Sequence, residues 1–179
     1  MTVQSDTTAT VPSATLAISP SAETSRLYQE GMIAGIAAAA AVAAWFFVLD
    51  VLHGRPLYTP TALGTALFRH GSGLGSPETL PISLEMVLMF TWVHGLVFAA
   101  VGGVAARLLG FAERNPNIGF GILLLFVVFQ AGFMGAALLV AAPILHAVAG
   151  SAILVANLLA AAVMGLFFWM RHPKLIVEP

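Results

Sequence analysis

The chain has 179 residues, of which 59% are hydrophobic and only 8% are charged. A soluble domain carries about a quarter charged residues, and a small globule leaves too much surface exposed to hide so much apolar material. Seven Lys and Arg balance eight Asp and Glu, so there is no basic surface for nucleic acid. The absence of cysteine excludes disulfides, thiolate metal sites and cysteine nucleophiles. The composition therefore predicts an integral membrane protein.

The first long apolar stretch follows a polar tail. Residues 1–25 contain eleven Ser or Thr and few large apolar side chains, which predicts a disordered cytoplasmic tail over residues 1–27. Met32 to Leu49 then form eighteen residues without a polar side chain. We expect a transmembrane helix there, over about residues 30–51. A cleaved signal peptide is the alternative, but no basic segment precedes this stretch.

The longest predicted connection, residues 52–83, lies between the first two spans. Its start, Arg55 to Pro60, contains two prolines, which predict a stiff turn. Thr61 to His70 predicts a short helix that lies in the membrane interface. The connection is too short to form a catalytic domain of its own. Any chemistry would therefore lie within the helices or at their outer ends.

Three further apolar stretches predict the remaining spans. They cover about residues 84–107, 119–142 and 147–170, and none has the polar stripe of a soluble helix. Pro143 separates the last two, because proline removes a backbone donor and breaks a helix. The sequence therefore predicts an all-α fold, an integral membrane bundle of four transmembrane helices over residues 28–174.

Basic residues near the ends of the spans predict the orientation. With four spans, both termini and the connection between the second and third spans lie on one side of the membrane. Cytoplasmic segments carry the excess of Lys and Arg. The side with the termini has five such residues near the spans and the other side has two, which places both termini in the cytoplasm. The five are Arg26, Arg107, Arg114, Arg171 and Lys174, and the two are Arg55 and Arg69.

Three segments carry a resemblance to a known group of proteins. They are Asp50–Pro60 (DVLHGRPLYTP), Phe90–Gly103 (FTWVHGLVFAAVGG) and Val155–Leu175, which contains the motif RHP. Together these segments resemble uncharacterised small four-span proteins of the bacterial inner membrane. The resemblance implies a multi-pass protein in that membrane. It implies no activity.

Three polar side chains interrupt the last three spans. His94, Gln130 and Asn157 lie about 12, 18 and 15 Å from the outer ends of their spans at 1.5 Å per residue. They are therefore expected to form one polar layer near the middle of the membrane. Hydrogen bonds between helices are the favoured role for this layer. The sharper alternatives make His94 a proton relay or a haem or metal ligand.

A second polar group is expected at the outer ends of the helices. It consists of Asp50, His53, Glu85 and His146, and imidazole and carboxylate groups can bind zinc, copper or iron. The spacing matches no tight metal motif, so these residues are weak candidates for a metal site. Alternatively, Asp50 pairs with Arg55, and Glu85 caps the helix that follows it.

Small residues at four-residue spacing predict the contacts between helices. Glycine lets two backbones approach closely in a membrane. These contacts would serve either the bundle itself or an oligomer. The glycines concerned are Gly31, Gly35, Gly95, Gly103 and Gly165.

The chain lacks the short motifs of nucleotide-binding proteins, metalloproteases and serine hydrolases. We therefore expect a structural or accessory subunit that is not an enzyme, with the lipid bilayer and either other membrane subunits or a second copy as partners. One alternative is a redox protein that binds haem or a divalent metal through intramembrane histidine. Another is a small transporter or channel in which the polar layer lines the path.

Overall fold

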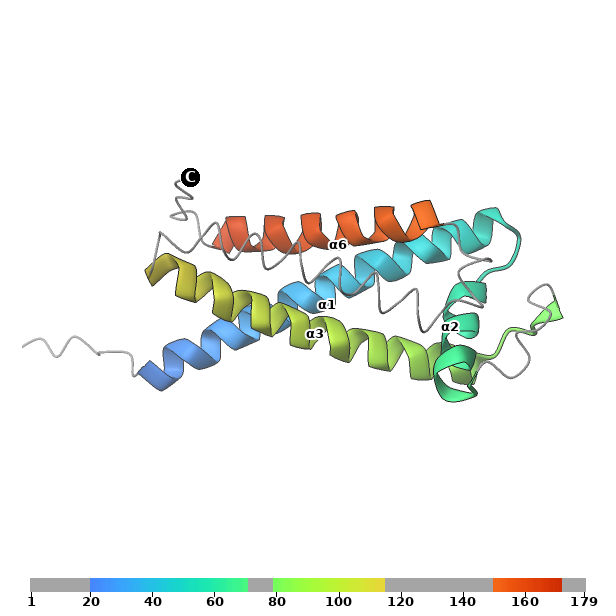
Figure 1. Ribbon diagram of the computed structural model, residues 1–179, viewed down its shortest axis with the longest axis horizontal. Coiled ribbons are helices and arrows are strands. Elements are labelled where there is room, and N and C mark those ends of the chain that lie inside the picture. The colour runs from blue at the N-terminus through green and yellow to red at the C-terminus, as the bar shows by residue number, and fades with distance from the viewer. Residues whose placement is uncertain (1–19, 71–78, 115–149, 172–179) are drawn as a thin grey trace, which may run out of the picture.

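The computed structural model describes residues 20–70, 79–114 and 150–171, and every regular element in these ranges is a helix. Three of the helices are long, and one of these packs against both of the others, while a short helix lies across one end (Figure 1). We call this end the α2 end. The long helices are α1 (Pro20–Leu52), α3 (Leu84–Arg114) and α6 (Gly150–Arg171), and the short one is α2 (Tyr58–Phe68).

The three long helices each contain a segment that is long and apolar enough to cross a membrane. The segments are Thr24–Leu52, Leu84–Ala112 and Ser151–Arg171, with 29, 29 and 21 residues. At 1.5 Å per residue, even 21 residues extend about 32 Å, which matches a hydrocarbon core of about 30 Å. The all-helical prediction is therefore confirmed for the described residues, and these helices indicate a membrane protein. The predicted span 119–142 lies outside the described residues.

α1 and α3 pack in antiparallel directions with their backbones in contact. A Cβ atom built on Gly102 would overlap the carbonyl oxygen of Gly31. A Cβ atom built on Gly35 would overlap the carbonyl oxygen of Phe98. One turn further along, the His94 ring lies 3.4 Å from the carbonyl oxygen of Ala39. Contacts at every fourth residue define a continuous stripe on each helix, which is the spacing of helical ridges.

A second stripe on α1 packs against α6, also in the antiparallel direction. Most of the buried residues in this contact are small. Nearer the end of α1, the indole Nε1 of Trp45 donates a hydrogen bond of 3.1 Å to the carbonyl oxygen of Ala152. Since α3 and α6 both run antiparallel to α1, they run parallel to each other. The buried residues are Ala34, Ala38 and Val42 on α1 and Ala156, Ala160 and Met164 on α6.

The outer surface of the long helices is formed by large apolar side chains. Leu88, Trp92 and Trp169 each expose about 70% of their surface (70, 71 and 72%). Such a surface would be unfavourable in water. By composition, it is compatible with contact to lipid.

The first helix begins earlier than the sequence analysis predicted. α1 starts at Pro20, whereas the sequence predicted a disordered tail as far as residue 27, and residues 1–19 lie outside the described part. Proline suits the first turn of a helix because its missing N–H needs no partner there. The extension also has a neighbour, because α3 continues to Arg114 and its Arg107 donates a hydrogen bond of 3.1 Å to the Tyr28 hydroxyl.

Candidate functional site

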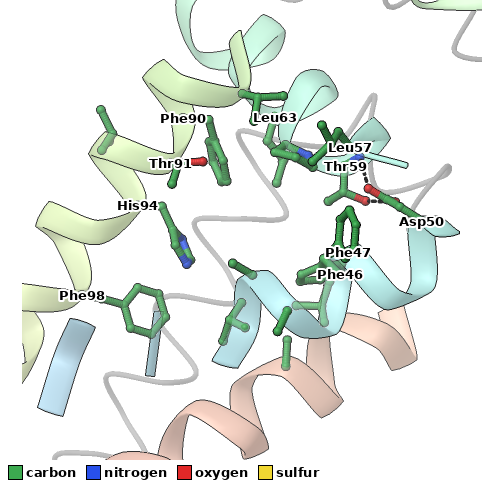
Figure 2. Close-up of a pocket in the computed structure, with 18 of the residues that line it drawn as sticks. Phe46, Phe47, Asp50, Leu57, Thr59, Leu63, Phe90, Thr91, His94 and Phe98 are labelled. Carbon is green, nitrogen blue, oxygen red and sulfur yellow. Dashed lines mark hydrogen bonds between the residues drawn. The ribbon is translucent and has the colours of Figure 1, made fainter. Parts of the chain in front are cut away.

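The chain leaves α1 through a short turn that is held by Asp50. This carboxylate is buried, and it accepts hydrogen bonds from the Thr59 backbone N–H (2.8 Å) and the Thr59 hydroxyl (2.6 Å), as Figure 2 shows. Thr59 lies in the first turn of α2, where backbone N–H groups have no partner within the helix. Asp50 supplies that partner from nine residues away, and a carboxylate is favourable at this positive helix end. We call these two hydrogen bonds the Asp50–Thr59 clasp.

Two residues between α1 and α2 have a left-handed backbone conformation, which the clasp helps to stabilise. Gly54 has a φ of 69°, which glycine adopts freely. Leu57, which immediately precedes α2, has a φ of 66°. A left-handed conformation costs about 1–2 kcal/mol for a residue with a Cβ atom. The two charge-assisted hydrogen bonds to Asp50 offset that cost and fix where α2 begins.

α2 packs against the start of α3. Gly64 faces the Met86 backbone so closely that a Cβ atom would not fit. The threonine hydroxyls on the buried face are satisfied within α2, since Thr61 donates to the Leu57 carbonyl and Thr65 to the Thr61 carbonyl, both at 2.8 Å. The short helix is therefore held against α3 across this end of the bundle.

The predicted metal ligands at this end do not come together. Asp50 is engaged by Thr59, the Nδ1 atom of His53 lies 2.7 Å from the Leu49 carbonyl oxygen, and Glu85 forms an exposed 3.2 Å ion pair with Arg69. Within the described ranges, no three His, Asp or Glu side chains form a group that could hold a metal ion. Asp50, His53 and Glu85, three of the four weak candidates for a metal site, are therefore not gathered in the described structure. His146 lies outside the described residues.

His94 lies deeper in the bundle, between two aromatic rings of its own helix. The Phe90 ring is stacked at 5.6 Å between centroids, and the Phe98 ring is tilted at 4.6 Å. The Nε2 atom is 3.4 Å from the Ala39 carbonyl oxygen. Since a carbonyl only accepts, this contact assigns the proton of a neutral ring to Nε2 and leaves Nδ1 as an acceptor.

Asn157 is the second intramembrane polar residue that the structure describes. Its Nδ2 atom is buried and has no hydrogen-bond partner in the described part of the chain. A buried amide donor without a partner is unfavourable by about 1–3 kcal/mol. Gln130, the third member of the predicted polar layer, lies outside the described residues.

His94 and Asn157 line the same cavity, which we call the aromatic cavity. Its volume is about 580 Å³, and its wall is formed by α1, the start of α2, α3 and α6. Figure 2 shows His94, Phe90 and Phe98 reaching into it from α3, while Asp50 and Thr59 lie towards the α2 end. Among the described residues, the lining is mainly apolar and contains four phenylalanines, Phe46, Phe47, Phe90 and Phe98. The polar residues of this described part of the lining are Asp50, Thr59, Thr91, His94 and Asn157.

The predicted packing glycines fall into two groups. Gly31 and Gly35 form the backbone contact with α3. A Cβ atom built on Gly103 would lie 3.6 Å from the Tyr28 side chain, which is an ordinary packing distance. By contrast, a Cβ atom on Gly95 or Gly165 would meet nothing within 4 Å among the described residues. Gly102, which was not among the predicted packing glycines, also lies in direct backbone contact with α1.

Sequence reasoning also missed the clasp and the cavity. Phe90, His94 and Phe98 recur every four residues, which is the one signal that would have placed these three rings on one helix face. No local signal links Asp50 to Thr59, because the turn between them decides their distance.

Comparison with known proteins adds no relative. No protein-family model, no curated protein and no solved structure matches the chain. The arguments on function therefore rest on the residues and their geometry.

The clasp predicts a specific loss of stability. Replacing Asp50 by Ala removes both acceptors and leaves the buried Thr59 hydroxyl without its carboxylate partner. We expect the free energy of unfolding in mixed micelles to fall by about 1–3 kcal/mol. Thr59→Val, which keeps the backbone N–H, should lose less, and hydrogen exchange should increase within residues 58–68 in both variants.

Thr91→Val is the matched control, since Thr91 is exposed on α3. We expect it to change the stability by no more than about 0.5 kcal/mol. If Asp50→Ala were as stable as this control, the clasp would not hold α2 in place.

Proposed function

We propose that this chain is a four-span protein of the bacterial inner membrane, with both termini in the cytoplasm, which serves as a structural or accessory subunit and not as an enzyme. The resemblance of its GRPLYTP and RHP segments to small four-span membrane proteins agrees with this proposal. The lipid bilayer is then its first partner, through the apolar outer faces of the helices.

The directions of the long helices support the number of spans. α3 and α6 run parallel, so α3 ends at the opposite end of the bundle from the one where α6 begins (Figure 1). This arrangement supports one further crossing of the membrane between the end of α3 and the start of α6. At 1.5 Å per residue, the 24 residues of the predicted span 119–142 would extend about 36 Å as a helix, enough for one crossing.

The basic residues support the orientation. Among the described residues, the end opposite α2 carries four arginines and the α2 end carries two, which favours a cytoplasmic location for the former. The four are Arg26, Arg107, Arg114 and Arg171, and the two are Arg55 and Arg69.

The observation that carries the role of a subunit is the exposed ring of Trp92 on α3, beside the half-buried Gly95. Trp92 is 71% exposed, yet it lies eight residues beyond Leu84, about 12 Å along the helix and away from the interface where tryptophan is enriched in membranes. A Cβ atom built on Gly95, one turn further along, would meet no described residue within 4 Å. A large ring beside an open glycine is suited to receive another helix.

The absence of cysteine makes the orientation simple to test. A single cysteine at His53 should react with a membrane-impermeant maleimide in intact spheroplasts, because this residue is exposed at the α2 end. A single cysteine at Ser25, which is exposed near the start of α1, should react only after the membrane is opened. The reverse pattern, or equal reaction at both positions, would contradict the proposed orientation.

A photo-crosslinking residue at position 92 tests the role of a subunit. We expect benzoylphenylalanine in place of Trp92 to crosslink the chain, in native membranes, to a second polypeptide or a second copy. The crosslinked species should appear as a heavier band on a denaturing gel and be identified by mass spectrometry. The same residue at Ile36, an exposed position on α1, is the control and should give mainly lipid adducts. Adducts at position 92 that never exceed the mass of one chain plus lipid would contradict this role.

A further inference from the structure

The aromatic cavity has the size and lining of a site for a small molecule. Its 580 Å³ lies within the range of about 300–1,000 Å³ for ligand pockets, which are lined mainly by apolar and aromatic groups with a few polar ones. Its walls extend on α3 from Val87 to Phe98, about 16 Å along the helix axis. The cavity therefore reaches from the α2 end to the middle of the bundle.

One polar side chain of the cavity wall, that of Asn157, has an amide donor that no described residue satisfies. The Asn157 amide lines the cavity, while its Nδ2 atom has no partner among the described residues. The amide oxygen and nitrogen exchange places by a half-turn of the side chain, so the donor can be presented to the cavity. A ligand that satisfies this donor must carry an acceptor such as a carbonyl oxygen.

The other groups around the cavity restrict the shape of the ligand. Phe46 and Phe47 from α1 and Phe90 and Phe98 from α3 offer ring faces and edges to a flat molecule. His94 retains Nδ1 as an acceptor once Nε2 contacts the Ala39 carbonyl. At the other end, the Asp50 carboxylate is already engaged by two hydrogen bonds from Thr59.

We propose that the aromatic cavity binds a membrane-soluble quinone, whose ring lies among the phenylalanines and whose carbonyl oxygen accepts a hydrogen bond from the Asn157 amide. This site is additional to the proposed role as a subunit and does not depend on it. The proposal concerns binding only.

Depth separates a quinone from a phospholipid as the occupant. Asn157 lies seven residues beyond Gly150, about 10 Å along α6 from the α2 end. The ester oxygens of a phospholipid stay near the headgroups, and its acyl chains carry no acceptor. A quinone ring, in contrast, carries its carbonyl groups into the hydrocarbon region, where Asn157 lies.

The test uses the full chain in phosphatidylcholine nanodiscs and an azido analogue of decylubiquinone as the photoaffinity probe. We expect saturable labelling that free decylubiquinone displaces. Labelled peptides should map to the cavity wall, on α1 near Phe46, on α3 near His94 or on α6 near Asn157. Half-displacement concentrations then give relative affinities for the variants.

Three variants decide which residues hold the probe. Asn157→Leu keeps the side-chain size and removes the amide, and we expect about tenfold weaker displacement, the effect of about one hydrogen bond. Ala43→Phe, at an exposed position of the cavity wall, should abolish saturable labelling by filling the space. Gln29→Leu removes an exposed amide far from the cavity and should leave the affinity unchanged.

Several results would overturn the proposal. These are labelling that does not saturate or is not displaced by decylubiquinone, and labelling that maps outside the cavity wall. Wild-type affinity in both Asn157→Leu and Ala43→Phe would also overturn it. Displacement by added phosphatidylglycerol but not by decylubiquinone would assign the cavity to lipid instead. Because Ala43 is outside the buried core, its variant keeps the test valid if Asn157→Leu fails to fold.

Discussion

Close packing on two sides of α1 is the contact on which the rest of the described structure depends. One stripe, with Gly31 and Gly35, brings the α1 backbone against α3, and the neighbouring stripe, with Ala34 and Ala38, receives α6. In a membrane, lipid is as apolar as the side chains, so helices associate through close van der Waals packing and not through exclusion of water. The small alanine and glycine residues of α1 let two helices approach it at once.

The size of the residues along α1 accounts for the position of the cavity. Small residues occupy the two stripes as far as Ala39, and the chain then continues into Trp45, Phe46 and Phe47 near the α2 end. Figure 1 shows α1 and α3 crossing and then separating towards α2. The clasp between Asp50 and Thr59 holds α2 across that opening. The aromatic cavity lies in the space between the separated helices, beneath α2.

Much of the fold could be predicted from the sequence, because long apolar stretches determine where helices cross a membrane. The predicted spans over 84–107 and 147–170 correspond to α3 and α6, although α3 extends to Arg114. The start of α1 could not be predicted, since its polar first turns gain their order from contacts such as Tyr28 with Arg107.

The candidate site was less predictable, because it depends on contacts between distant residues. Depth along the spans placed His94 and Asn157 at similar levels, and the structure places both on the wall of one cavity. The same reasoning grouped Asp50 with His53 and Glu85, although the turn after α1 directs Asp50 to Thr59 instead. Sequence position gives the depth of a polar residue but not the helix face that it shares with others.

The backbone contact between α1 and α3 is tested most directly by adding one methyl group to Gly102. Because a Cβ atom there would overlap the Gly31 carbonyl oxygen, Gly102→Ala should lower the free energy of reversible unfolding in mixed micelles by about 1–3 kcal/mol. The matched change Gly95→Ala, where a Cβ atom meets no described residue, should shift it by no more than about 0.5 kcal/mol. If the two variants were equally stable, α1 and α3 would not be packed backbone to backbone.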